Sequence, residues 1–411
     1  MIASSSYFTH TKEIIMILTN KQEEGLKIAV ARFKAGEPWT CISGYAGSGK
    51  STLVKFIISA LQIPEDEVCY VAYTGKAATV LQQKGCPNAM TAHKLLYWSS
   101  PTPSGKFIFK PRTSFENPCQ VVVVDEISML PRTMWELLLR HKVYVLALGD
   151  PEQLPPVDKD EDNHVLDNPH VFLDEIMRQA QESEIIRLSM HVREGKPLST
   201  FEAVGAQVQI FSPNQVVSGM YSWADQILCG TNAKRIEINN YVRAQKGFLT
   251  PEPQIGDKII SLRNHWDEIS KNGSWALTNG AIGTISKFDI EKVTFPFYVH
   301  ADSVEYMMTD MDLDDGDSFI RTPIDYQCLK TGQLSLSPKQ TYLINKNDNL
   351  RDAPYEFAYA YAITTHKAQG SEWDKVLIFE ESFPYQKDEH RRWLYTAITR
   401  AKEKCVIIKA F

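Results

Sequence analysis

The sequence lacks any apolar run close to the roughly 20 residues that a membrane-spanning helix needs, so we expect no membrane association. Its seven cysteines are widely spaced and form no Cys-x-x-Cys pair, which argues against a zinc site and a disulfide framework. Basic residues are not in excess, since 44 lysines and arginines stand against 50 acidic residues and the net charge is −6. This balance excludes a uniformly basic nucleic-acid coat but allows a narrow basic groove. We therefore expect a cytoplasmic protein with free thiols.

The chain is long enough for several domains, with 411 residues of which 43% are hydrophobic. Apolar, β-branched segments alternate with helical segments over 20–160 and again after 225, as at Trp39–Ser43, Cys119–Asp125 and Val143–Gly149. Such segments predict parallel strands buried on both faces, and hence an α/β fold. The pattern breaks at 97–118, where prolines predict an inserted β-hairpin, and at 256–345, where short strands predict a small β-barrel.

A glycine-rich turn after the first predicted strand matches the pattern of a phosphate-binding loop, Gly44-Tyr-Ala-Gly-Ser-Gly-Lys50-Ser51. In such a loop the glycines let backbone N–H groups surround phosphate oxygens at a helix N-terminus. Lys50 is expected to reach the β- and γ-phosphates of ATP, and Ser51 to hold Mg²⁺. The predicted nucleotide-binding residues of this turn are Gly44, Ala46, Gly47, Ser48, Gly49, Lys50, Ser51 and Thr52.

Two later strands end in side chains suited to hydrolysis of the bound nucleotide. Asp125 follows four valines and is expected to hold Mg²⁺ through water, while the adjacent Glu126 can polarise the attacking water. The alternative for Glu126 is a cap on the following turn. Gln153, on the loop after the third strand, can bond both phosphate and water through its amide. The sequence therefore predicts an ATP hydrolase that uses Mg²⁺.

Read in order, these segments resemble the motifs of the superfamily 1 helicases, and within them the RecD-like and Dda-like branch. The resemblance covers nearly the whole chain, and its longest strings are Thr364–Glu372 and Tyr395–Ala401. The other matching segments are Leu18–Gln22, Gly44–Thr52, Tyr73–Ala78, Thr91–Leu96, Asp125–Met129, Gly149–Pro155, Arg178-Gln179, and Ile227–Asn232 with Ile238-Asn239 and Arg243.

The resemblance implies two RecA-like motor domains with ATP in the cleft between them. Motor domain 1A would span 1–96 and 119–180 around a pin at 97–118, and motor domain 2A would span 181–280 and 351–411 around an SH3-like barrel at 281–350. By motif position, Gln22 reads the adenine, Gly370 and Glu372 contact the nucleotide, and Arg178 and Arg400 reach the γ-phosphate. The alternative for either arginine is a surface salt bridge.

The same resemblance implies an ATP-dependent DNA helicase that moves 5′ to 3′ on single-stranded DNA and parts duplex junctions. Its implied DNA contacts are Thr74, Lys76, His93, Trp98, Phe107, Asn232, Thr365 and His366. The two histidines have a second interpretation as buried, hydrogen-bonded groups. The other functions that remain open are an RNA-remodelling ATPase and a translocase that needs a partner. We expect a monomer in a bacterial or phage-infected cytoplasm, with replication or repair proteins as partners.

Overall fold

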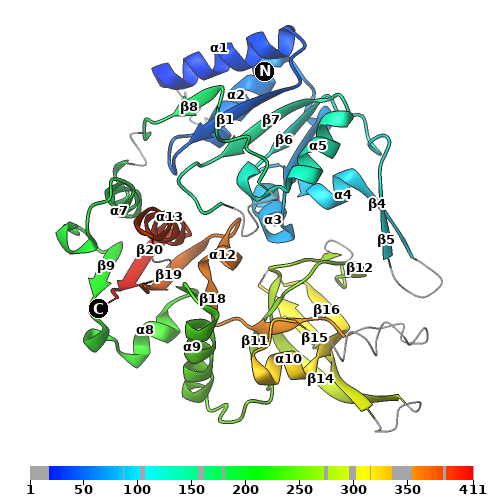
Figure 1. Ribbon diagram of the computed structural model, residues 1–411, viewed down its shortest axis with the longest axis vertical. Coiled ribbons are helices and arrows are strands. Elements are labelled where there is room, and N and C mark those ends of the chain that lie inside the picture. The colour runs from blue at the N-terminus through cyan, green and yellow to red at the C-terminus, as the bar shows by residue number, and fades with distance from the viewer. Residues whose placement is uncertain are drawn as a thin grey trace, which may run out of the picture.

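The computed structural model describes residues 18–86, 88–101, 107–155, 162–177, 181–272, 276–295, 302–314, 316–335, 354–382 and 386–410. They form an N-terminal unit on a parallel sheet, a C-terminal unit on a second parallel sheet, and an antiparallel sheet beside both (Figure 1). The two parallel sheets confirm the predicted α/β fold. Among the described helices, none has both the length and the apolar character needed to cross a bilayer.

The N-terminal unit has the strand order β3-β2-β6-β7-β1-β8, with every pair parallel. Its central strand β6, Val121–Val124, is buried along its whole length, as expected for β-branched residues covered on both faces. The remaining elements are α1 (Asn20–Lys34), β1 (Trp39–Gly44), α2 (Lys50–Leu61), a 3₁₀ turn (Glu65–Glu67), β2 (Val68–Ala72), α3 (Gly75–Gln83), β3 (Met90–Thr91), α4 (Ala92–Leu96), a 3₁₀ turn (Ile127–Met129), α5 (Arg132–Arg140), β7 (Tyr144–Gly149) and β8 (Val171–Leu173).

Side-chain caps fix where the helices of this unit begin. Thr19 and Gln22 form a reciprocal capping box at the start of α1, which satisfies two backbone N–H groups that the helix leaves free. Thr74 caps α3 by accepting a bond from the amide of Ala77. The helix α2 instead begins directly at Lys50, after Gly49 in a left-handed conformation.

The C-terminal unit has the strand order β18-β10-β19-β20-β9, again parallel throughout. Its core packs Trp393, Leu394 and Ile398 of one helix against the sheet. Its elements are α7 (Glu184–Arg193), a 3₁₀ turn (Leu198–Thr200), β9 (Val208–Phe211), a 3₁₀ turn (Pro213–Gln215), α8 (Ser218–Trp223), β10 (Gln226–Cys229), α9 (Asn232–Gln245), β18 (Ala362–Thr364), α12 (Thr365–Ala368), β19 (Trp373–Phe379), α13 (Lys387–Ile398) and β20 (Ala401–Ile408).

The antiparallel sheet has the order β16-β15-β14-β11-β17 and extends on both sides of the predicted 281–350 range. It begins at Lys258 and ends at Tyr359, because its first strand in the sequence, β11, pairs with the last strand, β17, on one side and with β14 on the other. The predicted strand at Gln340–Ile344 lies outside the described residues. The elements are β11 (Lys258–Ser261), β12 (His265–Ile269), β13 (Ala276–Leu277), β14 (Ile282–Phe295), β15 (Asp302–Leu313), β16 (Ser318–Asp325), α10 (Tyr326–Thr331) and β17 (Phe357–Tyr359).

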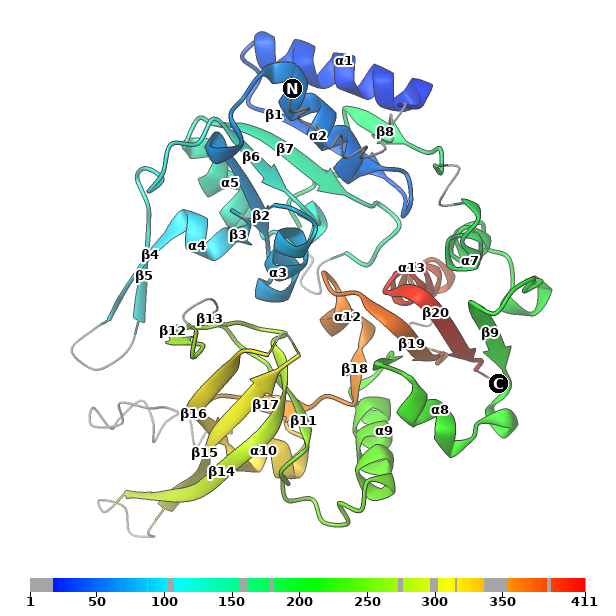
Figure 2. The same cartoon turned by 180° about the vertical axis from the view of Figure 1, so that it is seen from behind.

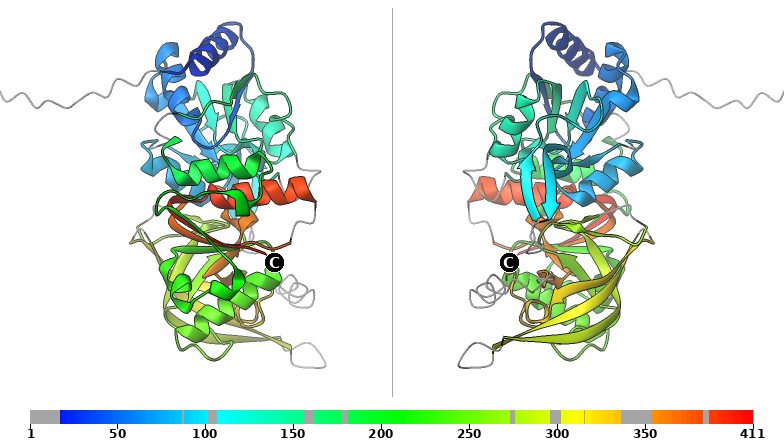
Figure 3. Two further views of the ribbon diagram at one scale, coloured as in Figure 1. Left: turned by 90° about the vertical axis from the view of Figure 1, so that its left-hand side faces the viewer. Right: turned by 90° about the vertical axis from the view of Figure 1, so that its right-hand side faces the viewer.

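A two-stranded hairpin stands off the N-terminal unit where the sequence predicts an insert. Strands β4, Tyr97–Pro101, and β5, Phe107–Pro111, pair antiparallel over their full length. Figures 1 and 2 show the hairpin at the margin of the molecule, on the side of the antiparallel sheet, and in the right-hand view of Figure 3 it faces the viewer. The hairpin itself is therefore confirmed, while its action as a wedge stays a prediction.

Candidate nucleotide site and cationic cavity

The predicted phosphate loop joins β1 to α2 at the carboxyl end of the first sheet. Lys50 folds back over the loop, and its Nζ donates to the carbonyls of Gly44 at 2.7 Å and Tyr45 at 3.1 Å. Gly47 and Gly49 have φ angles of 77° and 81°, a region that side-chain-bearing residues rarely adopt. The loop therefore has the conformation that lets backbone N–H groups face one point at a helix N-terminus.

The crowding around this loop explains why glycine is needed at position 49. A Cβ there would strike the Gln22 amide nitrogen and would lie 2.6 Å from Met177 Sδ. Gln22 is buried, and its amide donates to the Ser48 carbonyl at 3.1 Å while accepting from the Thr19 amide at 3.0 Å. Gln22 therefore holds the loop in place through its side-chain amide. A contact between this amide and adenine stays a prediction.

The two predicted acidic residues follow β6 directly. Burial raises the pKa of Asp125 to about 6, and the neighbouring charge of Glu126 adds to this rise. Glu126 adopts φ 51° and ψ 51°, a left-handed conformation that is costly for a residue with a side chain. The turn after β6 thus stores backbone strain at the position where the sequence predicts the general base.

Residues from both units meet at Glu126. Arg400, which follows α13 of the C-terminal unit, is 4% exposed and places its Nη1 3.8 Å from Glu126 Oε1. Gln153, on the loop after β7, lies between them; with its side-chain amide turned so that both neighbours are satisfied, it donates to Glu126 Oε2 and accepts from Arg400 Nη2, both at 3.1 Å. A buried arginine paired this way is not a surface salt bridge, so the structure rules out that alternative for Arg400.

A tyrosine that the sequence does not single out lies at the same junction between the two units. Tyr395 of α13 is buried, and its hydroxyl donates to Asp150 Oδ2 at 2.6 Å and accepts from the amide of Ala46 at 2.9 Å. One hydroxyl thus connects the phosphate loop, the end of β7 and the C-terminal unit. The residue lies in the string Tyr395–Ala401, but no local pattern indicates a partner hundreds of residues away.

The remaining predicted nucleotide contacts differ in how they lie relative to the loop. Gly370 packs against α3, where a Cβ would lie 3.0 Å from Ala77 Cβ. Glu372 forms a half-exposed ion pair with Lys84 at 3.1 Å. Arg178 lies outside the described residues. Ser51 and Thr52 occupy the first turn of α2, as expected for that motif.

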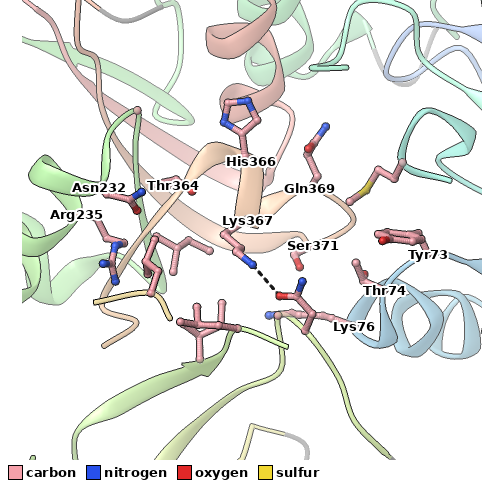
Figure 4. A pocket seen from close by; sticks show the side chains of 18 of the residues that line it. Tyr73, Thr74, Lys76, Asn232, Arg235, Thr364, His366, Lys367, Gln369 and Ser371 are labelled. Atoms are coloured by element: carbon pink, nitrogen blue, oxygen red, sulfur yellow. Dashed lines mark hydrogen bonds between the residues drawn. The ribbon is translucent and has the colours of Figure 1, made fainter. Parts of the chain in front are cut away.

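A cavity of about 650 Å³ opens where the two units and the antiparallel sheet meet (Figure 4). Four predicted contacts line it: Thr74, Lys76, Asn232 and His366. Several other lining residues are not among the predicted DNA contacts, including Arg235, Asn279, Thr364, Lys367, Gln369 and Ser371. Lys367, whose hydrogen bond is the dashed line in Figure 4, donates to Asn279 Oδ1 at 2.8 Å, so the loop that leads into β14 forms one wall of the cavity.

Other predicted contacts lie outside the lining of this cavity. The Thr365 side chain is fully buried and donates to the Cys229 carbonyl at 3.4 Å, whereas the neighbouring Thr364 lines the cavity, so a DNA contact by Thr365 stays a prediction. His93 stacks on Tyr97 with ring centroids 5.9 Å apart, and burial lowers its pKa to about 4, which favours the interpretation as a buried histidine. Trp98 is exposed at the hairpin, and the Phe107 side chain lies outside the described residues.

A short chain of contacts links the cavity to the nucleotide site. Gln369, on the cavity wall, donates to the carbonyl of Leu154 at 2.8 Å, and the amide of Leu154 donates to Thr396 of α13 at 2.9 Å. Leu154 directly follows Gln153, which contacts Glu126 and Arg400. A shift of either unit must therefore move groups in both places.

Two family models match the chain. The AAA domain model matches residues 18–212, and the UvrD-like helicase C-terminal domain model matches residues 359–408. The first match spans the N-terminal unit and runs through β9, and the second runs from the last residue of β17 to the end of β20. Together they include the phosphate loop, the acidic pair, Gln153, Tyr395 and Arg400.

Two curated relatives align along most of this chain. The ATP-dependent RecD2 DNA helicase of Deinococcus radiodurans is 24% identical over 396 residues, which are 90% of this chain and 47% of that protein. The ATP-dependent DNA helicase Dda of Enterobacteria phage T4 is 25% identical over 441 residues, covering 94% of this chain and 98% of its own length. The chain thus spans about half the length of the first relative and nearly all of the second.

Solved structures share the fold. Bacteroides Pif1 bound to single-stranded DNA is 19% identical with a TM-score of 0.51, and the comparison covers 95% of this chain and 92% of that one. Bacteroides Pif1 with ADP-AlF3 and single-stranded DNA is 18% identical with a TM-score of 0.50, covering 96% and 93%. At this identity the likeness supports the arrangement of the two parallel sheets.

Proposed function

We propose that the chain is an ATP-dependent DNA helicase of superfamily 1, in the RecD-like and Dda-like branch, and the matched family models and the two helicase relatives support this proposal. In this proposal the two parallel-sheet units are RecA-like motor domains that close on ATP. The cavity between them holds single-stranded DNA. One observation supports the proposal most: Glu126 of one unit and Arg400 of the other meet through Gln153 in the cleft beside the phosphate loop.

In the proposed hydrolysis, Lys50 leaves its two carbonyl partners and binds the β- and γ-phosphates. Glu126 takes a proton from the attacking water, and Gln153 orients that water. Arg400, which pairs with Glu126 in the structure, turns to the γ-phosphate and stabilises the charge that develops there. Glu126 is therefore released to act as the base only when the γ-phosphate replaces it as the partner of Arg400. Arg178 is proposed as a second arginine by motif position.

The residues present also fit Mg²⁺. Oxygen donors of the kind that Mg²⁺ prefers follow the loop and β6, in Ser51 and Asp125. Burial of the Asp125 carboxyl, which raises its pKa, leaves an anionic group that a divalent cation would stabilise. Ser51 and Asp125 would hold the ion, Asp125 through water. When bound, Mg²⁺ supplies charge neutralisation across the β- and γ-phosphate oxygens.

Movement along DNA is proposed to follow from the link between the two sites. Closure of the cleft moves α13 and the loop after β7, and Gln369 transmits this to the wall of the cavity. The proposed polarity is 5′ to 3′, with the β4–β5 hairpin as the wedge and the antiparallel sheet as an SH3-like clamp. The resemblance to the branch supports the polarity and these two roles.

Unwinding of tailed duplexes tests this proposal. One substrate has a 5′ single-stranded tail and the other a 3′ tail, each with ATP and Mg²⁺, and Lys50→Ala serves as the inactive control. We expect strand separation only from the 5′ tail and none with the control. Separation only from the 3′ tail would keep the helicase but overturn the polarity. An RNA-tailed substrate unwound equally well would support RNA remodelling instead.

A further inference from the structure

The cavity between the units has an unusual charge balance. Three cations line it, Lys76, Arg235 and Lys367, while none of the described lining residues is an aspartate or glutamate. The chain as a whole has a net charge of −6, so acidic residues are not scarce. Burial lowers the pKa of each of these three side chains, which means that the cavity stabilises none of the charges by itself.

Arg235 is the most confined of the three. It projects from the second turn of α9 and is 5% exposed. Within the described part of the chain its hydrogen bond runs from Nη2 to the carbonyl of Gly332 at 3.2 Å, and its buried Nε has no acceptor. No described carboxylate pairs with it. The nearby Glu381 is engaged by the Gly230–Thr231 turn, where it accepts from Thr231 Oγ1 at 2.7 Å.

Lys367 faces the same space from α12. Its Nζ bonds only the neutral amide oxygen of Asn279, at 2.8 Å, within the residues that the structure describes. Its pKa falls because of burial and, in addition, because of the like charges of Arg263 and Arg235. Two desolvated cations that repel one another are unfavourable unless an anion lies between them.

We infer that Arg235 and Lys367 form one phosphate subsite, which holds a single backbone phosphate of the strand in the cavity. Arg235 of α9 supplies a planar fork that suits a phosphate diester, and Lys367 of α12 supplies a point charge to the same cavity. Thr231 and Asn232 at the start of α9 border the same space. This inference rests on the proposed function, since it assigns the ligand of the cavity to single-stranded DNA.

The first test measures binding of a fluorescent single-stranded oligonucleotide over a series of salt concentrations. Arg235→Gln is expected to bind at least tenfold more weakly and to reduce the log–log salt slope by about 0.7, the value for one phosphate contact on a single strand. Arg235→Lys keeps the charge and is expected to restore the slope. Lys234→Gln is the matched control, because Lys234 is the adjacent residue of α9 and pairs with Glu237 at 2.7 Å.

The second test identifies which backbone phosphate occupies the subsite. It uses a short single-stranded tail beside a duplex junction, so that each nucleotide of the tail keeps one position relative to the protein. Single methylphosphonate linkages, which remove one charge each, are placed along the tail. We expect one linkage to weaken binding to the unsubstituted protein, and both Arg235→Gln and Lys367→Gln to be insensitive to that same linkage. Sensitivity that persists in both variants would overturn the subsite. The unsubstituted protein and Arg235→Lys report on this linkage even if Arg235→Gln fails to fold.

The outcomes separate this inference from the proposed function. If the unsubstituted protein does not bind single-stranded DNA, the proposed function fails and the subsite with it. If that protein binds, while Arg235→Gln has the same affinity and salt slope as Lys234→Gln, only the subsite is wrong. Loss of slope in Arg235→Gln but not in Lys234→Gln supports it.

Discussion

Replacing Tyr395 by phenylalanine tests whether the C-terminal unit controls the phosphate loop. The substitution removes only the hydroxyl, which donates to Asp150 at 2.6 Å and accepts from the Ala46 amide at 2.9 Å. Burial and the charge of Asp150 raise the pKa of Tyr395 well above its ordinary range, so the hydroxyl stays protonated and remains a donor at any pH of interest. Its loss therefore acts on the contact between the units at all working pH values.

The magnitude follows from the two lost hydrogen bonds. The bond to the Asp150 carboxylate is charge-assisted, and together the pair is worth about 2–4 kcal/mol. When the cleft opens, water solvates Asp150 and Ala46 again, so the loss falls on closure rather than on the fold of either unit. At 1.36 kcal/mol per factor of ten, even about 2 kcal/mol shifts the closure equilibrium by roughly 30-fold. We expect the DNA-stimulated kcat of ATP hydrolysis to fall by at least about tenfold.

Steady-state ATPase assays with saturating single-stranded DNA measure this effect, and Tyr144→Phe is the matched control. The Tyr144 hydroxyl is also buried and makes two hydrogen bonds, to Thr40 at 2.6 Å and to the Ala29 carbonyl at 3.0 Å, but both lie inside the N-terminal unit. The control is expected to lower Tm and leave kcat near its original value. Equal kcat values for the two variants would refute the idea that Tyr395 couples the units.

Three further perturbations have defined outcomes. Burial lowers the pKa of Lys76 from 10.5 to about 8, so its ammonium group loses its charge as pH rises through 8. DNA affinity, measured by anisotropy, should therefore fall between pH 7 and 9. In Lys76→Gln the affinity should depend less on pH over this range. Because the unfolded state keeps the Lys76 proton to higher pH, this residue should make unfolding free energy rise, not fall, over the same window, as a denaturant titration at several pH values can check. Gly49→Ala should weaken binding of a fluorescent ATP analogue about tenfold, whereas Gly36→Ala, with φ +73° and open space around its Cβ position, controls for backbone strain alone. Glu126→Gln should bind the analogue normally yet hydrolyse ATP about 100- to 10,000-fold more slowly in single-turnover assays, and unimpaired hydrolysis would remove Glu126 as the base.

Local patterns predicted the strands and the glycine-rich turn of the candidate nucleotide site, because these elements are determined by short segments of sequence. The valines of β6 and the glycines of the loop after β1 determine backbone paths within a few residues, and the structure has these strands and this turn where they were expected. Arg400 was predicted from its motif alone. Its contact with Glu126 depends on how the two units pack against each other, which periodicity does not describe.

The features that the sequence did not predict depend on contacts between residues far apart in the chain, or on which of two neighbouring side chains faces the cavity. Thr364 and Thr365 differ by one position at a strand-to-helix turn, and only the packing against Cys229 decides which one faces the cavity. In the sequence, Arg235 cannot be distinguished from other polar residues of an amphipathic helix, because its burial depends on Gly332 and on the cavity wall, which are distant in the chain. The antiparallel sheet begins before residue 281 because Lys258–Ser261 pairs with both β14 and β17, and that pairing spans about a hundred residues of chain.

In the proposed function, DNA in the cavity lined by Lys76, Arg235 and Lys367 controls ATP hydrolysis at the phosphate loop. The most direct measurement is the steady-state rate of ATP hydrolysis by the unsubstituted protein during titration with a single-stranded oligonucleotide, with binding followed in parallel by anisotropy. The account predicts a rate that rises with occupancy and saturates when binding saturates. A rate that stays constant while the oligonucleotide binds would contradict it.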